Sequence, residues 1–145
     1  MIDKVKIPEE RVAVIIGTKG QIKKRLYDQF QVQVDIKESE VTIDGEPLNV
    51  FIAKQIIRAI GRGFSPEHAF LLERDDYQLE VIEISKYANT KNATIRLRGR
   101  VIGKQGTSKE KLEELTESYI SVYGKTIGII AKIEMMPTAV EAIDM

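Results

Sequence analysis

The chain of 145 residues has no cysteine and one histidine. Without cysteine it can form no disulfide framework, no thiolate metal site and no cysteine nucleophile. The histidine, His68, follows Ser65 and Pro66 in what reads as a first helical turn, which favours a structural place over a metal-binding one. No nucleophile–base pair or spaced carboxylate dyad stands out. We therefore expect a protein that is not an enzyme, with no catalytic residues, no bound metal and no cofactor.

Long apolar runs are also missing. No stretch approaches the ~20 apolar residues that a membrane-spanning helix needs. The N-terminal segment Met1–Lys6 lacks the apolar core of a signal peptide. These absences predict a cytoplasmic protein with no membrane partner.

Net charge is absent too, because 22 basic residues balance 22 acidic ones. Neutrality would argue against a nucleic-acid partner only if the charges were evenly spread. The acidic runs are interpreted as solvated faces. The basic residues instead gather in two clusters: Lys19, Lys23, Lys24 and Arg25, then Lys91, Arg96, Arg98, Arg100, Lys104, Lys109 and Lys111.

Each basic cluster surrounds a Gly-x-x-Gly sequence. Val-Ile-Ile-Gly-Thr-Lys-Gly at 14–20 returns as Arg-Val-Ile-Gly-Lys-Gln-Gly at 100–106. The same offset of about 86 residues aligns the alternating apolar positions that follow, so the repeat extends beyond the loop. Two copies of one small α+β unit are therefore predicted.

The periodicity predicts the same order of elements in both copies. In the first copy we expect a strand at 4–7, helices at 8–16 and 21–29, strands at 32–36 and 41–43, and a helix at 48–60. In the second we expect a strand at 79–84, helices reaching 102 and starting at 107, strands at 120–122 and 126–130, and a helix from 137.

This order, with Gly-x-x-Gly between two helices, resembles that of the type I KH domain. The residues that carry the resemblance are 15–20 and 101–106, each with a leucine six residues past the second glycine, Leu26 and Leu112. Lys23 and Lys109 depart from the common KH pattern, which has an aliphatic residue there, and we expect both lysines to point outward or to join the basic rim.

The predicted fold class is thus α+β, with two type I KH domains in tandem, each a three-stranded antiparallel sheet packed by three helices. The first domain is expected over 1–64, a connecting helix over 65–76 and the second domain over 77–145, with its C-terminal helix truncated.

Two further blocks narrow the resemblance: Ala-Ile-Gly-Arg-Gly-Phe-Ser-Pro-Glu-His-Ala at 59–69 and Ile-Ser-Val-Tyr-Gly-Lys-Thr at 120–126. Across its whole length the chain resembles archaeal members of the tandem-KH small-subunit ribosomal RNA assembly factors. That resemblance implies a non-catalytic protein that binds the single-stranded 3′ end of small-subunit ribosomal RNA during ribosome maturation. It also implies two protein partners, the Nob endonuclease and the alpha subunit of initiation factor two.

The residues alone point to phosphate contact. Glycines at both ends of a four-residue link let two helices meet sharply, and the second helix then points its free N–H groups at the turn. Lysines beside the turn add Coulombic attraction, and such a groove admits about four single-stranded nucleotides. The second copy has the denser basic surround and is predicted to carry most of the RNA affinity. The residues predicted to bind RNA are Ile16, Gly17, Thr18, Lys19, Gly20, Lys23, Lys24, Arg98, Arg100, Ile102, Gly103, Lys104, Gln105, Gly106 and Lys109.

Other interpretations stay open. The loop glycines could be ordinary helix-cap and turn residues. Arg96, Arg98 and Arg100 alternate and could form a solvated strand edge. A phosphate-loop NTPase is set aside because Gln105 stands where that motif needs Ser or Thr. The rival function is a protein-interaction adaptor that docks an endonuclease or an initiation factor through the loop face or the helix at 52–60.

Overall fold

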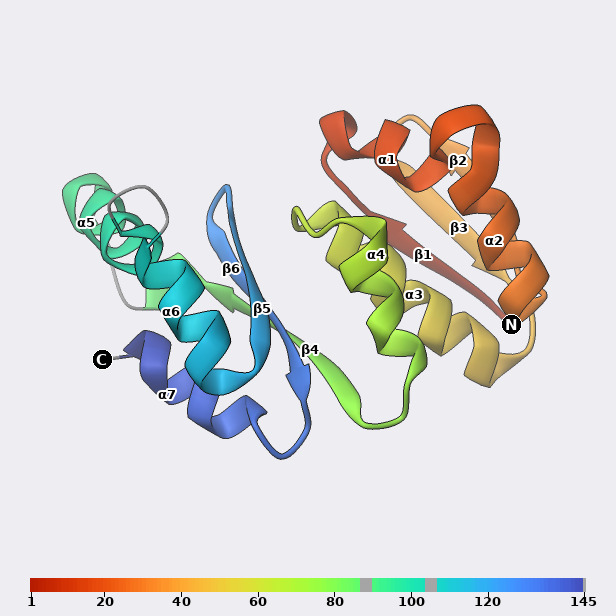
Figure 1. The fold of residues 1–145 in the computed structure, drawn as a ribbon. Helices are drawn as coiled ribbons and strands as arrows, with labels where there is room; N and C mark the ends of the chain where they lie inside the picture. The colour runs from red at the N-terminus through yellow and green to blue at the C-terminus, as the bar shows by residue number, and fades with distance from the viewer. Residues whose placement is uncertain (87–89, 104–106, 145) are drawn as a thin grey trace. The chain divides into compact units, whose positions relative to one another are not determined.

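The computed structural model describes residues 1–86, 90–103 and 107–144. By its internal contacts the chain divides into two compact units, Met1–Glu73 and Arg74–Met145. Each unit has one three-stranded antiparallel sheet with helices packed on it, as Figure 1 shows. The predicted α+β class and the pair of KH-like units are confirmed.

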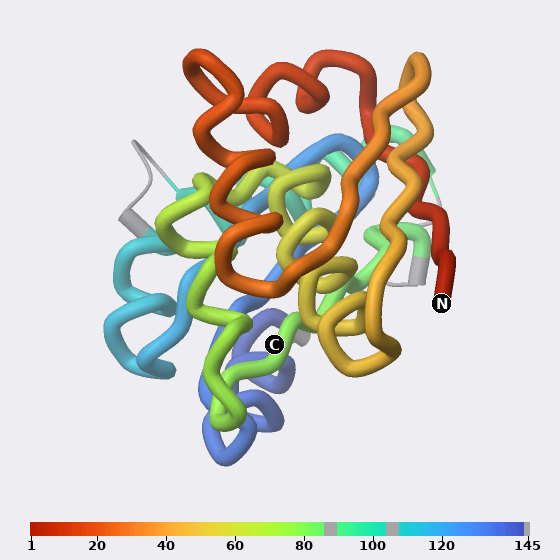
Figure 2. The backbone as a smooth tube through the Cα atoms, turned by 90° about the vertical axis from the view of Figure 1, so that its right-hand side faces the viewer, coloured from red at the N-terminus to blue at the C-terminus, as the bar shows by residue number. Residues whose placement is uncertain are grey.

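The first unit contains the following elements: β1 (Ile2–Lys6), η1 (Glu9–Arg11), α1 (Val12–Ile16), η2 (Thr18–Gly20), α2 (Gln21–Phe30), β2 (Gln33–Lys37), β3 (Glu40–Asp44), α3 (Pro47–Gly61), α4 (Pro66–Ala69) and η3 (Phe70–Glu73). The sheet order is β1-β3-β2, so β2 is an edge strand. Figure 2 shows the β2–β3 hairpin, in orange, beside the red β1.

Alternating apolar residues in β2 and β3 place Val34, Val41 and Ile43 in the core of this unit. Helix α3 begins with Pro47, which suits a first helical turn, and buries a face that includes Ala53 and Ile57. Leu26 and Phe30 of α2 are buried as well.

The segment predicted as a connecting helix, 65–76, has a different structure. Helix α4 spans one turn from its cap residue Ser65, whose Oγ accepts a hydrogen bond from the His68 N–H at 3.3 Å. Both α4 and η3 pack on α3, because Ala69, Phe70 and Leu72 are apolar and buried. Residues up to Glu73 therefore belong to the first unit, and β4 begins three residues after Arg74.

The second unit contains β4 (Tyr77–Glu83), η4 (Ile84–Lys86), α5 (Lys91–Ile102), α6 (Thr107–Thr116), β5 (Ser118–Tyr123), β6 (Thr126–Lys132) and α7 (Met136–Asp144). The sheet order is β4-β6-β5, so β5 takes the edge position that β2 has in the first unit. Ile127 and Ile129 of β6 pack with Leu97, Val101 and the α7 face formed by Met136, Ala139 and Ile143.

The first helix differs most between the units. Helix α5 has 12 residues, whereas α1 has five. It begins at Lys91 because Thr90 acts as the N-cap: its Oγ1 accepts a hydrogen bond from the Ala93 N–H at 3.0 Å. The extra turns place Lys91, Arg96 and Arg98 on a helix, so the alternative of a solvated strand edge is wrong.

Candidate nucleic-acid interface

The first Gly-x-x-Gly sequence forms a sharp turn between α1 and α2. Gly17 ends α1 with φ 77° and ψ 173°, and its N–H donates to the Ala13 carbonyl at 2.9 Å. A Cβ at Gly17 would lie 2.5 Å from Ile22 Cγ1 and 2.9 Å from the Ile22 backbone nitrogen. Glycine is therefore required here both by the positive φ and by the close approach of α2.

Gly20, at the other end of the turn, has φ 73° but meets no atom within 4 Å in the direction of a Cβ. No side chain caps α2 at this residue. The turn therefore presents bare backbone at the positive end of a ten-residue helix. That is the arrangement expected of a phosphate site.

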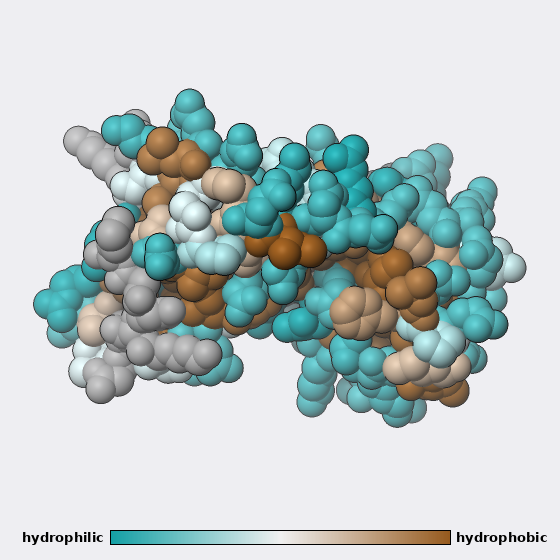
Figure 3. Space-filling view, turned by 90° about the horizontal axis from the view of Figure 1, so that it is seen from below, coloured by the Kyte–Doolittle hydropathy of each residue, from teal (hydrophilic) through white to brown (hydrophobic). Residues whose placement is uncertain are grey.

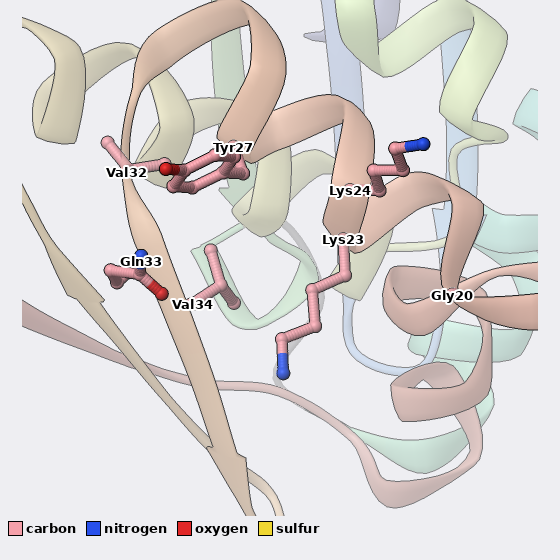
Figure 4. A pocket seen from close by; sticks show the side chains of 7 residues that line it. All are labelled: Gly20, Lys23, Lys24, Tyr27, Val32, Gln33 and Val34. Atoms are coloured by element: carbon pink, nitrogen blue, oxygen red, sulfur yellow. The ribbon is translucent and has the colours of Figure 1, made fainter.

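A groove of about 290 Å³ runs beside this turn between α2 and the edge strand β2. One side is lined by Gly20, at the end of the turn, and by Lys23, Lys24 and Tyr27 of α2. The other side is lined by Val32, Gln33 and Val34, at the start of β2 and just before it. Figure 4 shows Lys23 extending from α2 on the side where Val34 lies. Val32 and Val34 are buried and form an apolar floor, whereas the two lysines are exposed.

The predicted residues of the first unit lie together around this groove. Thr18 and Lys19 are exposed in the turn, Ile16 is 38% exposed beside it, and Lys23 points outward as expected. Sequence reasoning left Tyr27 and Gln33 out of the site. Tyr27 could have been found, because residues 20, 23, 24 and 27 have the spacing of one helix face.

The second Gly-x-x-Gly sequence begins with the same backbone conformation as the first. Gly103 ends α5 with φ 69° and ψ −179°, close to the angles of Gly17, and its N–H donates to the Gly99 carbonyl at 2.7 Å. A Cβ at Gly103 would collide with the Ser108 side chain. Of the predicted residues, Lys104, Gln105 and Gly106 lie outside the described residues, while Ile102 and Lys109 are half-buried next to them.

Arg98 and Arg100 do not share one face, because residues two apart on a helix point in nearly opposite directions. Arg98 is half-buried. Arg100 is exposed, and its Nη2 lies 3.4 Å from the Ile143 carbonyl oxygen of α7. Arg100 therefore lines the α7 side of the unit together with Ala142 and Ile143, rather than the edge strand β5.

The edge strand of the second unit has an acidic neighbour. Glu113 of α6, at the position equivalent to Tyr27, accepts a hydrogen bond from the Ile120 N–H of β5 at 2.7 Å through Oε2. A hollow beside it of about 470 Å³ is lined by Glu113, Glu114, Glu117 and Tyr119, among others. The groove beside β2 in the first unit is therefore lined by lysines and valines, whereas the charged residues that line the hollow beside β5 in the second unit are mainly glutamates.

The comparisons with known proteins agree with this geometry. A KH-domain family model matches residues 2–59, and the model for the eukaryotic-type KH domain (KH-domain type I) matches residues 78–145. The crystal structure of Dim2p from Pyrococcus horikoshii superposes with a TM-score of 0.91 at 38% identity, covering 99% of this chain and 89% of that one. The chain belongs to the archaeal Dim2p family. The resemblance drawn from the sequence is confirmed.

Further matches also span nearly the whole of this chain. The KH domain-containing protein MJ0443 of Methanocaldococcus jannaschii is 46% identical over 150 residues, which cover 99% of this chain and 66% of that protein. The chain thus spans just under two thirds of that relative's length. A complex of a/eIF2alpha, aDim2p and rRNA from Pyrococcus horikoshii matches at 39% identity with a TM-score of 0.91, covering 99% of this chain and 83% of that chain.

The part of the chain that the structure describes lacks two kinds of feature. Its helices include none both long enough and apolar enough to cross a membrane. Its His, Asp and Glu side chains form no group of three or more that could hold a metal ion.

Proposed function

We propose that this Dim2p-family chain is a non-catalytic protein that binds the single-stranded 3′ end of small-subunit ribosomal RNA during ribosome maturation. The observation that carries the proposal is the first turn, where bare backbone at the start of α2 adjoins an open groove with exposed lysines. The similar aDim2p of Pyrococcus horikoshii, crystallised with rRNA, supports the choice of ligand.

The groove suits a nucleic-acid strand because its parts serve different groups of the ligand. Phosphates fit the turn, where backbone N–H groups and the ammonium groups of Lys19 and Lys23 provide donors and positive charge. Bases fit the apolar floor of Val32 and Val34, with Tyr27 at its end. The free edge of β2 offers backbone N–H and C=O groups to base edges.

The partners belong to the same proposal. The alpha subunit of initiation factor two is supported by the crystallised complex of a relative, whereas the Nob endonuclease and a cytoplasmic location rest on the family resemblance and on the composition. In this account the chain positions the RNA, and any cleavage is done by a partner.

RNA binding can be tested by titrating the full chain with a labelled 3′-terminal small-subunit rRNA fragment and with a scrambled strand of equal length. We expect tighter binding of the first strand and an affinity that falls with salt, with a log–log slope of about 0.7 per phosphate contacted. Replacing Thr18 and Lys19, or Lys104 and Gln105, by aspartate should weaken binding at least about tenfold. The second pair is predicted to have the larger effect.

Lys6→Asp supplies a matched control, because Lys6 is an exposed lysine on β1, the edge of the sheet opposite β2. This variant should bind RNA about as wild type does. Equal binding by all variants would overturn the proposal, and salt-insensitive capture of a partner protein without RNA would favour the adaptor function. Magnesium-dependent cleavage of the RNA would contradict the non-catalytic assignment.

A further inference from the structure

We propose that a groove between α5, α6 and α7 of the second unit binds a short helical segment of a partner protein. The segment would carry an aromatic residue and, three positions later, a carboxylate. This surface is separate from the Gly-x-x-Gly turns and goes beyond RNA binding. The first unit, a copy of the same module, shows which chemistry such a surface takes.

In the first unit the segment that follows α3 packs against one side of α2, where Arg25 and Gln29 contact it while remaining partly open to solvent. The ring of Phe70 stacks on Phe30, with centroids 6.5 Å apart and planes 13° from parallel. The Arg25 guanidinium carbon lies 3.7 Å above the Phe70 ring centre. With its amide oriented to suit both neighbours, Gln29 donates to Glu73 at 3.1 Å and accepts from Arg25 Nε at 3.1 Å.

In the second unit the equivalent face of α6 borders an open groove. The offset of about 86 residues places Lys111 at the position of Arg25, Leu112 at that of Leu26 and Leu115 at that of Gln29. All three residues line a groove of about 290 Å³ with Val101 and Ile143. Leu115 is 74% exposed, which is unusual for a leucine beside an apolar groove.

The exposed leucine shares its groove with both apolar and charged side chains, among them Ile143 and Lys111. Figure 3 shows such a mixed pattern, with apolar patches among hydrophilic side chains, on the face that it presents. Burying Leu115 under a partner would remove its apolar surface from water, which favours association. A partner with a matching apolar residue would therefore gain affinity here.

The charged side chains of the groove indicate which polar and aromatic residues the partner segment should carry. Lys111 and Arg100 are exposed cations that line it, and their positive charge matches a carboxylate. In the first unit the carboxylate of Glu73 is held at this face by Gln29, which also bonds to Arg25. A lysine ammonium can also rest on an aromatic face, as the Arg25 guanidinium does on Phe70. Since Val101 and Ile143 are only 2% exposed and apolar, the floor favours a hydrophobic protein segment over a nucleotide base.

The segment that follows α3 in the first unit and packs on α2 provides the probe. A fluorescent peptide with the sequence of residues 62–76 is added to the full-length chain, and anisotropy is measured. We expect saturable binding that weakens at least about tenfold with Leu115→Asp or with Lys111→Glu. A Phe70→Ala or Glu73→Lys change in the peptide should weaken binding to a similar extent.

Leu48→Asp is the matched control, because Leu48 is 69% exposed on α3 and the substitution is the same. That variant should bind the peptide as wild type does, and Leu115→Asp should leave rRNA binding unchanged. The proposal is overturned by absent binding, by binding that Leu115→Asp does not affect, or by displacement of the peptide by single-stranded RNA. A shift of the chain from dimer to monomer on Leu115→Asp would assign the groove to a second copy instead.

Discussion

Gly17 and Gly20 bound the same turn but are needed for different reasons. Both have a positive φ, which favours glycine. Only Gly17 is also closely packed, against Ile22 at the start of α2, whereas the space outside Gly20 is open. The structural demand therefore falls mainly on Gly17, and Gly20 leaves room for a ligand.

Alanine substitutions separate these roles. Gly17→Ala should lower the free energy of unfolding by about 2 kcal/mol, because the added Cβ meets the α2 backbone in a strained conformation. Gly20→Ala should cost only about 1 kcal/mol, the usual penalty of a left-handed residue. Urea denaturation followed by circular dichroism measures both values. Equal losses for the two variants would contradict the distinction.

A second residue-scale prediction concerns Asp3 on β1. The Lys54 ammonium, 3.0 Å from Asp3 Oδ2, holds the pKa of this carboxyl below its ordinary value. The Lys4 N–H, which donates to Oδ1 at 2.8 Å, adds to the effect. Because the folded pKa is depressed, the stabilisation is present above the unfolded pKa and disappears as pH falls through the folded value.

Lys54→Met should raise the Asp3 pKa towards its ordinary value, which an NMR titration of the Asp3 carboxyl carbon would measure. The variant should be less stable than wild type at neutral pH and equal to it below the folded pKa. A stability difference that persists unchanged into strong acid would show that Lys54 acts through packing instead.

At the scale of elements, Arg11 links the start of α1 to the end of α3. Its Nε donates to the Ile60 carbonyl and its Nη2 donates to the Phe64 carbonyl, both at 2.8 Å. These acceptors lie at the carboxyl end of α3, where a cation is favoured. Gly61 supports the same junction, because a Cβ there would lie 2.7 Å from Ile7 Cγ2.

Arg11→Met should therefore destabilise the first unit by about 2 kcal/mol, since it leaves two partly buried carbonyls without a charged donor. Thermal unfolding would show the loss as a lower Tm. Arg58→Met is the matched control, because the Arg58 guanidinium bonds only to Gln55 of the same helix among the hydrogen bonds described. A loss as large for Arg58→Met would contradict the role of Arg11.

Gly99 lowers the helix propensity of α5. This glycine is exposed, has no positive φ, and would meet nothing within 4 Å if it gained a Cβ. Gly99→Ala should stabilise the second unit by about 0.5–1 kcal/mol through helix propensity alone. Chemical denaturation of the full chain measures the gain. A loss of stability would show that the backbone at Gly99 needs its freedom.

At the scale of the whole molecule, the two units that we propose to bind RNA should reinforce each other. Once one unit holds a strand, the other meets the same strand at a high effective concentration. An rRNA fragment long enough for both units should then bind about 10²-fold more tightly than either half. Titration with the full fragment and its two halves measures this. Equal affinities for the long and short strands would mean that the units act separately.

The units are also unequal in a way that charge counting did not reveal. The second unit has more basic residues around its Gly-x-x-Gly sequence, but Arg100 faces α7 and Glu113 accepts a hydrogen bond from an N–H of the edge strand. In the first unit Tyr27 stands at the position of Glu113, and the groove beside it is open. The prediction that the second unit binds RNA more strongly now depends on its loop and on Lys109.

Local patterns predicted most of the elements. The repeated glycine loop, the alternating apolar residues and the helix caps depend on neighbours in sequence, so the order of strands and helices was predicted correctly in both units. The alternation of Arg96, Arg98 and Arg100 left a strand edge open as an alternative to the predicted helix, and α5, which begins after the Thr90 cap, includes all three residues. The segment at 65–76 was misjudged because Phe70 and Leu72 find their partners in distant elements.

The sequence by itself determined the duplicated module, its α+β class and the placing of glycines at both turns, because backbone conformation and apolar periodicity are local properties. Only the tertiary structure decided which side chains share a surface. Tyr27 and Val34 line one groove, Glu113 accepts a hydrogen bond from β5, and Leu115 borders an open groove whereas its counterpart Gln29 bonds to Glu73. These outcomes depend on contacts between elements far apart in the chain, which a single sequence does not record.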